Sequence, residues 1–354
     1  MNPIARILPP LALVALAAAC GTDRSALGPS VPRLAAEADA QPSYSDWSTP
    51  INLGPVVNSA GDENRPAISK DGLSLYVSSN RPGGFGGLDL WVSQRASVND
   101  AWGPLQNLGP NINSDSNESA PAFSPDQHHL YFHSFKTGGC GGADLYVARR
   151  QDKRNDLGWE PAENLGCVVN STANDAGPTI FEDEATGITT LYFTSTRPGG
   201  PGDFDIYAST RAGDDAAFGP AVLVPELSGP ARDTRTAISR DELELFMSSD
   251  VTGRVGGVGG QDLWVSARAT ILDLWLTPVN LGPVVNTTAF DGGPALSFDG
   301  TALYFFSNRL GGFGGNDLYM STRTRLRGPA VGDAGLETHG EARGHGKKKA
   351  HREE

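Results

Sequence analysis

The chain has 354 residues, including 44 glycines and 25 prolines, and its formal net charge is −13. This composition is typical of an all-β protein rich in tight turns, and the length accommodates one large domain or two of average size. A strongly anionic protein repels phosphate backbones, so we expect no nucleic-acid partner.

Residues 1–19 predict an export signal. A single arginine precedes an apolar run that ends in small residues and is too short to span a bilayer. The segment resembles a bacterial lipoprotein signal, which implies that Cys20 receives a lipid; Gly21 after it favours the outer membrane. Ala17 stands where such signals usually carry leucine, so ordinary cleavage after Ala19, leaving the cysteine free, stays open as an alternative.

The segments that flank the central part of the chain predict disorder. Residues 20–46 are rich in alanine, serine and proline without apolar periodicity and are predicted to be a disordered tether. Residues 331–354 are rich in glycine, lysine and histidine and are predicted to be a disordered tail. We therefore expect an exported protein of the cell envelope, an outer-membrane lipoprotein that faces the periplasm or the surface and touches the membrane only through its lipid.

One pattern occurs five times between these flanks. A glycine cluster is followed by aspartate, leucine or isoleucine, and an aromatic residue, in the copies GGFGGLDLW, GGCGGADLY, GGPGDFDIY, GGVGGQDLW and GGFGGNDLY. An apolar run such as SLYVSS precedes each copy, and a PAIS-like step precedes that run. A tryptophan or phenylalanine with an NLG-like step lies between copies. Each unit thus supplies four short strands, and such units stack in a ring because none can bury both faces alone.

The repeat resembles the WD40-like propeller repeat of TolB-type periplasmic proteins. The matching segments are PAISKDGLSLYVSSNRPGGFGGLDLWVS at 66–93 and PALSFDGTALYFFSNRLGGFGGNDLYMS at 294–321, and the resemblance covers residues 47–325. It implies a bacterial envelope protein with a β-propeller fold that binds other proteins.

The two ends of the repeat array complement each other. The segment WSTPINLG at 47–54 precedes the first unit, whereas the last unit ends without an NLG step. We therefore predict a five-bladed β-propeller of four-stranded antiparallel blades over residues 47–330, with the N-terminal strand 47–54 closing the ring and leaving no open edge.

Five acids lie three residues before the proline position of each PAIS-like step. If the innermost strands line the channel, these acids converge near its mouth and could hold a cation, an amine or a hydroxyl-rich ligand. The alternative is that each accepts N–H groups of its own loop. Two arginines of the same strands could neutralise part of the ring or confer specificity. The candidate ligand ring is Glu63, Glu118, Asp175, Asp233 and Asp291, with Arg65 and Arg235.

The aspartates that end the glycine clusters are interpreted as structural turn residues, because no helix or GxxxxGK[ST] motif follows that could bind phosphate. They are Asp89, Asp144, Asp205, Asp262 and Asp317.

Two cysteines replace the usual residues of their repeat positions on the same rim of neighbouring blades. Cys140 stands in a glycine cluster and Cys167 in an NLG-type segment. In an oxidising compartment they favour a disulfide, while buried free thiols are the alternative. Three histidines of the second repeat, His128, His129 and His133, favour surface or cross-strand packing over zinc, so no metal site is predicted.

No residue set indicates a reaction, and no cofactor is expected. The leading interpretation is a non-enzymatic binding or scaffolding module of the cell envelope, with a protein or peptide bound on the propeller rim. The alternative is a propeller that binds or hydrolyses glycan: some five-bladed propellers are glycosidases, although these need two or three carboxylates placed asymmetrically at the axis, whereas the acids here repeat in all five blades.

Overall fold

The structure is a computed structural model, and it describes residues 43–213, 216–250 and 252–326. The predicted export signal 1–19, the lipidation site Cys20 and the predicted tail 331–354 lie outside these residues. All regular elements of the described residues are β-strands, so none of them forms a helix that could cross a membrane.

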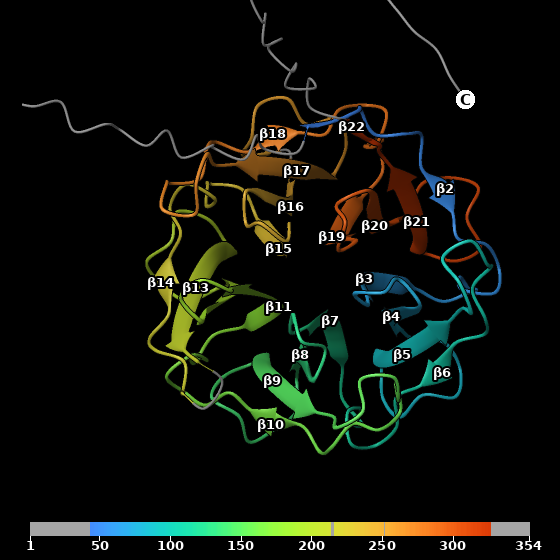
Figure 1. Cartoon of the computed structure of the whole chain (residues 1–354), viewed down its shortest axis with the longest axis horizontal. Helices are drawn as coiled ribbons and strands as arrows, with labels where there is room; N and C mark the ends of the chain where they lie inside the picture. Colours follow the sequence, from blue (N-terminus) through green and yellow to red (C-terminus); the bar gives the residue numbers. More distant parts are fainter. Residues whose placement is uncertain (1–42, 214–215, 251, 327–354) are drawn as a thin grey trace, which may run out of the picture. The chain divides into compact units, whose positions relative to one another are not determined.

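Five four-stranded antiparallel sheets are arranged around a central channel (Figure 1). The innermost strands are β3 (Glu63–Ile68), β7 (Glu118–Phe123), β11 (Asp175–Asp183), β15 (Asp233–Ile238) and β19 (Asp291–Leu296). The second strands are β4 (Ser74–Ser79), β8 (His129–Ser134), β12 (Ile188–Ser195), β16 (Glu244–Asp250) and β20 (Ala302–Ser307). We number the sheets that begin with β3, β7, β11, β15 and β19 as blades one to five. The predicted all-β, five-bladed propeller is confirmed.

The outer strands complete each blade. The third strands are β5 (Asp89–Gln94), β9 (Asp144–Arg149), β13 (Asp205–Ala212), β17 (Gln261–Ala267) and β21 (Asp317–Thr322). The outermost strands have two residues each and are β6 (Gln106–Asn107), β10 (Glu163–Asn164), β14 (Val222–Leu223), β18 (Val279–Asn280) and β2 (Ile51–Asn52). The fifth blade therefore takes its outermost strand from the start of the folded chain.

The two ends of the folded chain also meet in a second pairing. β1 (Ser43–Tyr44) runs antiparallel to β22 (Arg325–Leu326). Beside it, the guanidinium of Arg323 lies over the rings of Tyr44 and Trp47, at 3.6 and 4.6 Å from their centroids. The predicted tether 20–46 thus overlaps the folded unit by its last residues, because these residues pair with the end of the last blade.

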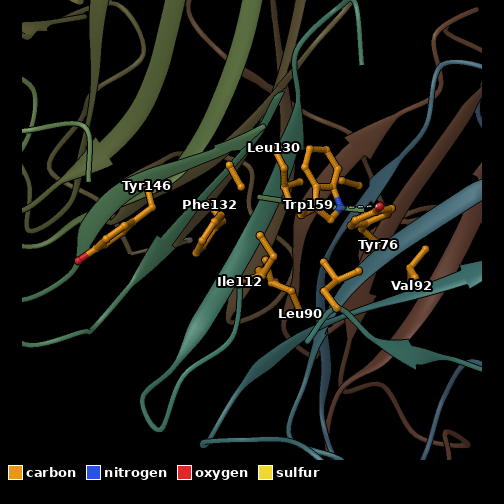
Figure 2. Packing of buried hydrophobic residues seen from close by; sticks show 11 residues of the cluster. Tyr76, Leu90, Val92, Ile112, Leu130, Phe132, Tyr146 and Trp159 are labelled. Carbon is orange, nitrogen blue, oxygen red and sulfur yellow. Dashed lines mark hydrogen bonds between the residues drawn. The ribbon is translucent and has the colours of Figure 1, made fainter. Parts of the chain in front are cut away.

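The hydrophobic core is divided among the five interfaces between neighbouring blades. The cluster between blades one and two combines Tyr76 and Leu90 of the first blade with Leu130 and Phe132 of the second (Figure 2). Trp159 joins this cluster and donates its indole N–H to the hydroxyl of Tyr76 at 3.1 Å. Because each cluster takes its side chains from two blades, a single blade removed from its neighbours would expose apolar faces.

The glycine clusters form the loops between the second and third strands, and we call the side of the ring that carries them the loop face. Each loop touches the segment leading into the next blade. A Cβ atom on Gly86 would lie 2.0 Å from the carbonyl oxygen of Ser116, and one on Gly141 would lie 2.2 Å from that of Ala173. Glycine is required here because the two backbones approach too closely for any side chain.

A disulfide joins Cys140 and Cys167, the two cysteines paired in the sequence analysis, with a Cα–Cα distance of 5.5 Å. It links the glycine loop of blade two to the segment that enters blade three. We expect Cys140→Ser to lower the free energy of unfolding by about 3 kcal/mol, because the bond closes a loop with a sequence separation of 27 residues. Chemical denaturation measures this, with reduced wild type as the control. Equal stability of variant and oxidised wild type would contradict it.

Candidate functional site

Each innermost strand carries a bulge at the same position, where the ladder to the second strand shifts register. The bulged residues have positive φ angles of 44°, 59°, 60°, 43° and 63°, and they are Arg65, Ala120, Gly177, Arg235 and Gly293. A bulge re-aims the side chain at its site, and here it directs two arginine side chains into the channel. Positive φ is unfavourable for non-glycine residues, so the backbone is strained at both arginines and at Ala120.

Four of the five bulged residues donate their N–H groups to side chains of the preceding blade. The acceptors are Ser78 Oγ at 3.1 Å for Ala120, His133 Nδ1 at 3.4 Å for Gly177, Thr194 Oγ1 at 3.1 Å for Arg235 and Ser248 Oγ at 2.8 Å for Gly293. Each bond links two blades beside the channel. His133, which the sequence analysis assigned to packing, is thus a channel residue, and burial followed by the charges of Arg65 and Arg235 holds its pKa well below the ordinary range. Its imidazole is neutral at pH 7.

Arg235 crosses the channel and bridges the other blades. Its Nη1 donates to the carbonyl oxygens of Ala120 and Pro178 at 3.0 and 3.2 Å, and its Nη2 donates to those of Pro66 and Pro121 at 3.2 and 2.7 Å. Burial, with a smaller contribution from Arg65, lowers the pKa of this guanidinium to about 9. Arg235 therefore holds three other blades together and keeps its positive charge at neutral pH.

Two further arginines lie on the loop-face side of this crossing. Arg65 donates from Nη1 to the hydroxyl of Ser119 at 3.1 Å, and burial followed by the charge of Arg232 lowers its pKa to about 10. The guanidinium of Arg232 stacks over the ring of Phe204, 4.6 Å from the centroid. Three cationic side chains thus share the loop-face end of the channel.

Two adjoining cavities, of about 270 and 400 Å³, open beside these arginines. We call them together the channel site; both are lined by Arg65, Arg232, Thr234 and Arg235. The remaining polar lining consists mainly of amides, and the aromatic lining comes from several blades. The amides are Asn64, Asn117, Asn174, Gln261, Asn308 and Asn316, and the rings are Phe135, Phe204, Phe290 and Phe306.

Asp250 is the single carboxylate among the described residues that line the channel site. It accepts a hydrogen bond from Gln261 Nε2 at 3.2 Å. Burial, the largest influence, and the charge of Asp233 raise its pKa, and together they outweigh the opposing effects of Arg232 and Gln261. A carboxyl with a raised pKa in a cavity is suited to proton transfer.

The five acids of the predicted ligand ring do not line the channel site. All five are fully buried, and each accepts a backbone N–H from the residue four positions earlier. Four of them also form ion pairs with arginines just beyond the second strand of the same blade. The pairs are Glu63–Arg81 at 2.9 Å, Asp175–Arg197 at 2.6 Å, Asp233–Arg254 at 3.0 Å and Asp291–Arg309 at 2.6 Å. Of the two readings given in the sequence analysis, the placement of these acids as a ligand ring at the channel mouth is therefore corrected, and the reading that each accepts N–H groups of its own loop is confirmed.

Of the predicted ring, only Arg65 and Arg235 lie in the channel, and they are not the arginines that neutralise the acids. Residues that the sequence analysis missed at the channel site are Arg232, Asp250 and Phe290. The sequence could have indicated such residues because they differ from the residues that other blades carry at the equivalent positions of the repeat. Asp62, Asn117 and Asn174 hold the position that Arg232 and Phe290 hold in blades four and five.

The aspartates that end the glycine loops lie against their own loops. Asp89 accepts the N–H of Phe85 at 2.6 Å, and Asp317 accepts that of Phe313 at 2.6 Å. A Cβ on Gly84 would lie 1.7 Å from the Asp89 carboxylate, so the carboxylate occupies the space that a side chain would need. The equivalent acceptors in the other blades are Asp144, Asp205 and Asp262.

The remaining histidines of the second repeat lie away from the channel site. The Nδ1 atom of His128 is 2.9 Å from the carbonyl oxygen of Arg150, and that of His129 is 3.9 Å from Asp126. Within the described ranges no group of three or more His, Cys, Asp or Glu side chains is placed to hold a metal ion.

A third cavity, of about 170 Å³, opens on the side of the ring opposite the loop face. Arg240 and Lys70 lie there over the ring of Phe298, 4.9 and 4.4 Å from its centroid. Arg235 lines this cavity as well as the channel site, so its side chain separates the two ends of the channel.

The fold and this site define the class of the protein as a five-bladed β-propeller with a cationic, amide-lined channel. No protein-family model and no curated protein matches the chain. Among solved structures it is similar to an α-L-arabinofuranosidase from Lactobacillus brevis (14% identity, 77% of this chain and 92% of the other, TM-score 0.53). It is also similar to the catalytic domain of a GH62 α-L-arabinofuranosidase from Coprinopsis cinerea (15% identity, 80% and 98% covered, TM-score 0.50). A GH43 endo-arabinanase from Bacillus licheniformis matches too (14% identity, 75% and 94% covered, TM-score 0.50).

These comparisons correct two predictions. The three solved structures named above are two arabinofuranosidases and an arabinanase, which contradicts the non-enzymatic module that binds protein or peptide and favours the alternative, a propeller that binds or hydrolyses glycan. They also contradict assignment to the TolB-type family, because no family model matches and the structural neighbours are hydrolase propellers. At these identities the likeness shows the fold alone.

Proposed function

We propose that this propeller binds a glycan at the channel site. The observation that carries the proposal is the combination of half-exposed aromatic rings with converging amides around an open polar cavity. Phe290 and Phe135, which are 50% and 44% exposed, offer faces on which the apolar side of a sugar ring stacks. The side chains of Asn117, Asn174 and Asn308 accept backbone N–H groups at Oδ1, which fixes their orientation and leaves their NH2 groups as donors to hydroxyl oxygens.

Hydrolysis of the bound glycan is a second candidate, supported by Asp250. Its raised pKa suits a general acid, and Asp233 is near enough to contribute to the rise. Most glycosidases use two carboxylates on opposite sides of the scissile bond. Asp233, however, is buried against Arg254, so it would have to lose that ion pair to act in such a pair.

Binding and turnover are tested together. Purified propeller is titrated by calorimetry with oligosaccharides of arabinose, xylose, glucose and uronic acids, and the same mixtures are analysed for released products by chromatography. We expect Phe290→Ala to weaken binding roughly three- to tenfold, because one stacking contact is lost, and we expect any product release to be lost in Asp250→Asn.

Phe85→Ala is the matched control, since Phe85 is equally exposed, at 50%, but lies in a glycine loop outside the channel-site lining. Its affinity should equal that of wild type. Failure of every glycan to bind would refute the proposal, and equal losses in both phenylalanine variants would place the ligand elsewhere.

We further propose that the chain is exported to the cell envelope. The Cys140–Cys167 disulfide supports this, because such bonds persist in oxidising compartments. Cell fractionation followed by intact-mass analysis tests it: an envelope protein that begins at Cys20 and carries a lipid is expected, and an unprocessed cytoplasmic chain would contradict it.

A further inference from the structure

The channel site carries positive charge that the carboxylates of the protein do not neutralise. Arg65 and Arg235 direct their hydrogen bonds to one hydroxyl and to four carbonyl oxygens, and neither forms an ion pair with a described residue. By contrast, several buried or half-buried arginines elsewhere in the ring are paired with acids of their own blades, as Arg81 and Arg197 are. Unpaired charge in a cavity attracts a ligand of the opposite sign.

Burial makes this charge costly. Arg235 is 4% exposed, and its Nε–H is buried without an acceptor among the described residues. Only burial and neighbouring arginines shift the pKa of Arg65 and Arg235, and all of these influences lower it. An anion in the adjoining cavity would raise the pKa of both arginines, because it stabilises the charged guanidinium.

The other polar groups that line the channel site do not neutralise the positive charge of the arginines. His133 is held neutral, so it adds no further positive charge, and an imidazole offers no negative charge to balance the arginines. Asp250 is the one lining carboxylate, and among these arginines Arg232 is the one whose charge lowers its pKa. Three guanidiniums therefore face one carboxyl group.

The backbone at Arg65 and Arg235 points to a role for their side chains. Both have positive φ at a bulge where blades three and five have Gly177 and Gly293. Glycine would adopt this conformation without strain, so the fold itself does not require arginine at these positions. Arg235 makes bonds that hold other blades, whereas the side chain of Arg65 makes a single hydrogen bond to the described residues, to Ser119.

We propose that the glycan bound at the channel site is acidic, with a uronate carboxylate held by Arg65 and Arg232, and with the charge of the neighbouring Arg235 adding to the attraction. This inference rests on the proposed glycan binding. The planar fork of a guanidinium matches a carboxylate with two parallel hydrogen bonds. Phe204 and Phe290, which line the same cavities, would contact the sugar ring. A carboxylate is favoured over a doubly charged phosphate because Asp250 lines the same site.

The test uses Arg65→Gly in the intact propeller. The variant places in blade one the residue that blades three and five already have, so we expect a melting temperature equal to or above that of wild type. The probes are a trisaccharide of uronic acid, its neutral methyl ester and a sulfated neutral trisaccharide, which differ in the acidic group. Wild type should bind the acid at least about tenfold more tightly than the ester, and Arg65→Gly should remove most of that difference.

Arg240→Ala is the control, because it removes the same charge from the opposite side of the ring, where the Arg240 side chain is 61% exposed. Its preference for the acid should be unchanged. Equal binding of acid and ester by wild type would overturn the acidic ligand and leave glycan binding intact. Preference for the sulfated probe would overturn the carboxylate, and an unchanged preference in Arg65→Gly would overturn the role of Arg65. Failure of all three probes and of every neutral glycan would instead refute the proposed function.

Discussion

Removal of residues 43–54 is expected to destroy the cooperative folding of the propeller. The segment supplies β2, which pairs with β21 through Ile51 and Asn52, and β1, which pairs with β22. It also supplies Trp47, whose ring packs edge-on against Phe246 at 5.8 Å. Loss of a buried tryptophan costs about 3–5 kcal/mol, and we take the lower end because Trp47 is partly buried; this is still a large part of the stability of an ordinary domain. The deletion also leaves the third strand of blade five as an unpaired edge.

The measurement is thermal unfolding by circular dichroism with light scattering to detect aggregation. A truncation that ends before Ser43 is the control, because it keeps both β1 and β2. We expect the control to unfold in one transition and the longer truncation to aggregate or to lose its transition. If the two truncated proteins unfolded at the same melting temperature, these strands would not be what holds the ring closed.

The blades could be predicted because each copy of the repeat contains the residues that form its own strands and turns. Glycines permit the close approach of loops, the apolar second strands fill the interfaces between blades, and the aspartates accept their own loop N–H groups. The pairing of β1 with β22 could not be predicted, because two-residue strands of mixed polarity carry no periodic signal.

The channel site was harder to predict. The repeat indicates which residues are equivalent in the five blades, but it does not indicate in which direction a bulge points their side chains. Glu63 and Arg65 are two residues apart, which in a regular strand would put both on one face. The bulge beyond Asn64 breaks this alternation, so the acid is enclosed by its loop and the arginine enters the channel. The five equivalent acids thus have a structural role. The channel site is formed instead by residues that occur in only one or two of the five blades.

The same distinction explains why the resemblance to TolB-type repeats misled the assignment of function. The residues that carried it, such as the PAIS-like step and the aspartate after the glycines, form turns and inner strands. Those residues specify a blade, and one fold supports many functions. Arg232, Arg235 and Asp250 belong to blade four and lie outside the motif, so they are the part of the sequence that carries information on the ligand.

Asp175→Asn is expected to lower the free energy of unfolding by about 3 kcal/mol while leaving glycan affinity unchanged in the folded fraction. The carboxylate is fully buried and accepts Arg197 Nη2 at 2.6 Å and Ser171 N at 2.5 Å, so an amide would leave the guanidinium without its counter-charge. Breaking a buried pair from one side costs about 3–5 kcal/mol, and we take the lower value because the Arg197 side chain is 16% exposed.

Glu118→Gln provides the comparison from within the same ring. Glu118 is equally buried and binds Ser114 and Ser134, but among the described residues it forms no ion pair. Its amide variant therefore loses hydrogen bonds without stranding an arginine, and we expect a smaller loss than for Asp175→Asn. Urea denaturation of both variants measures the difference. If Glu118→Gln were the more destabilising variant, the ion pairs with the arginines would not be the main stabilisation of the buried acids. A selective loss of glycan binding in Asp175→Asn would show that these acids contribute to the binding site.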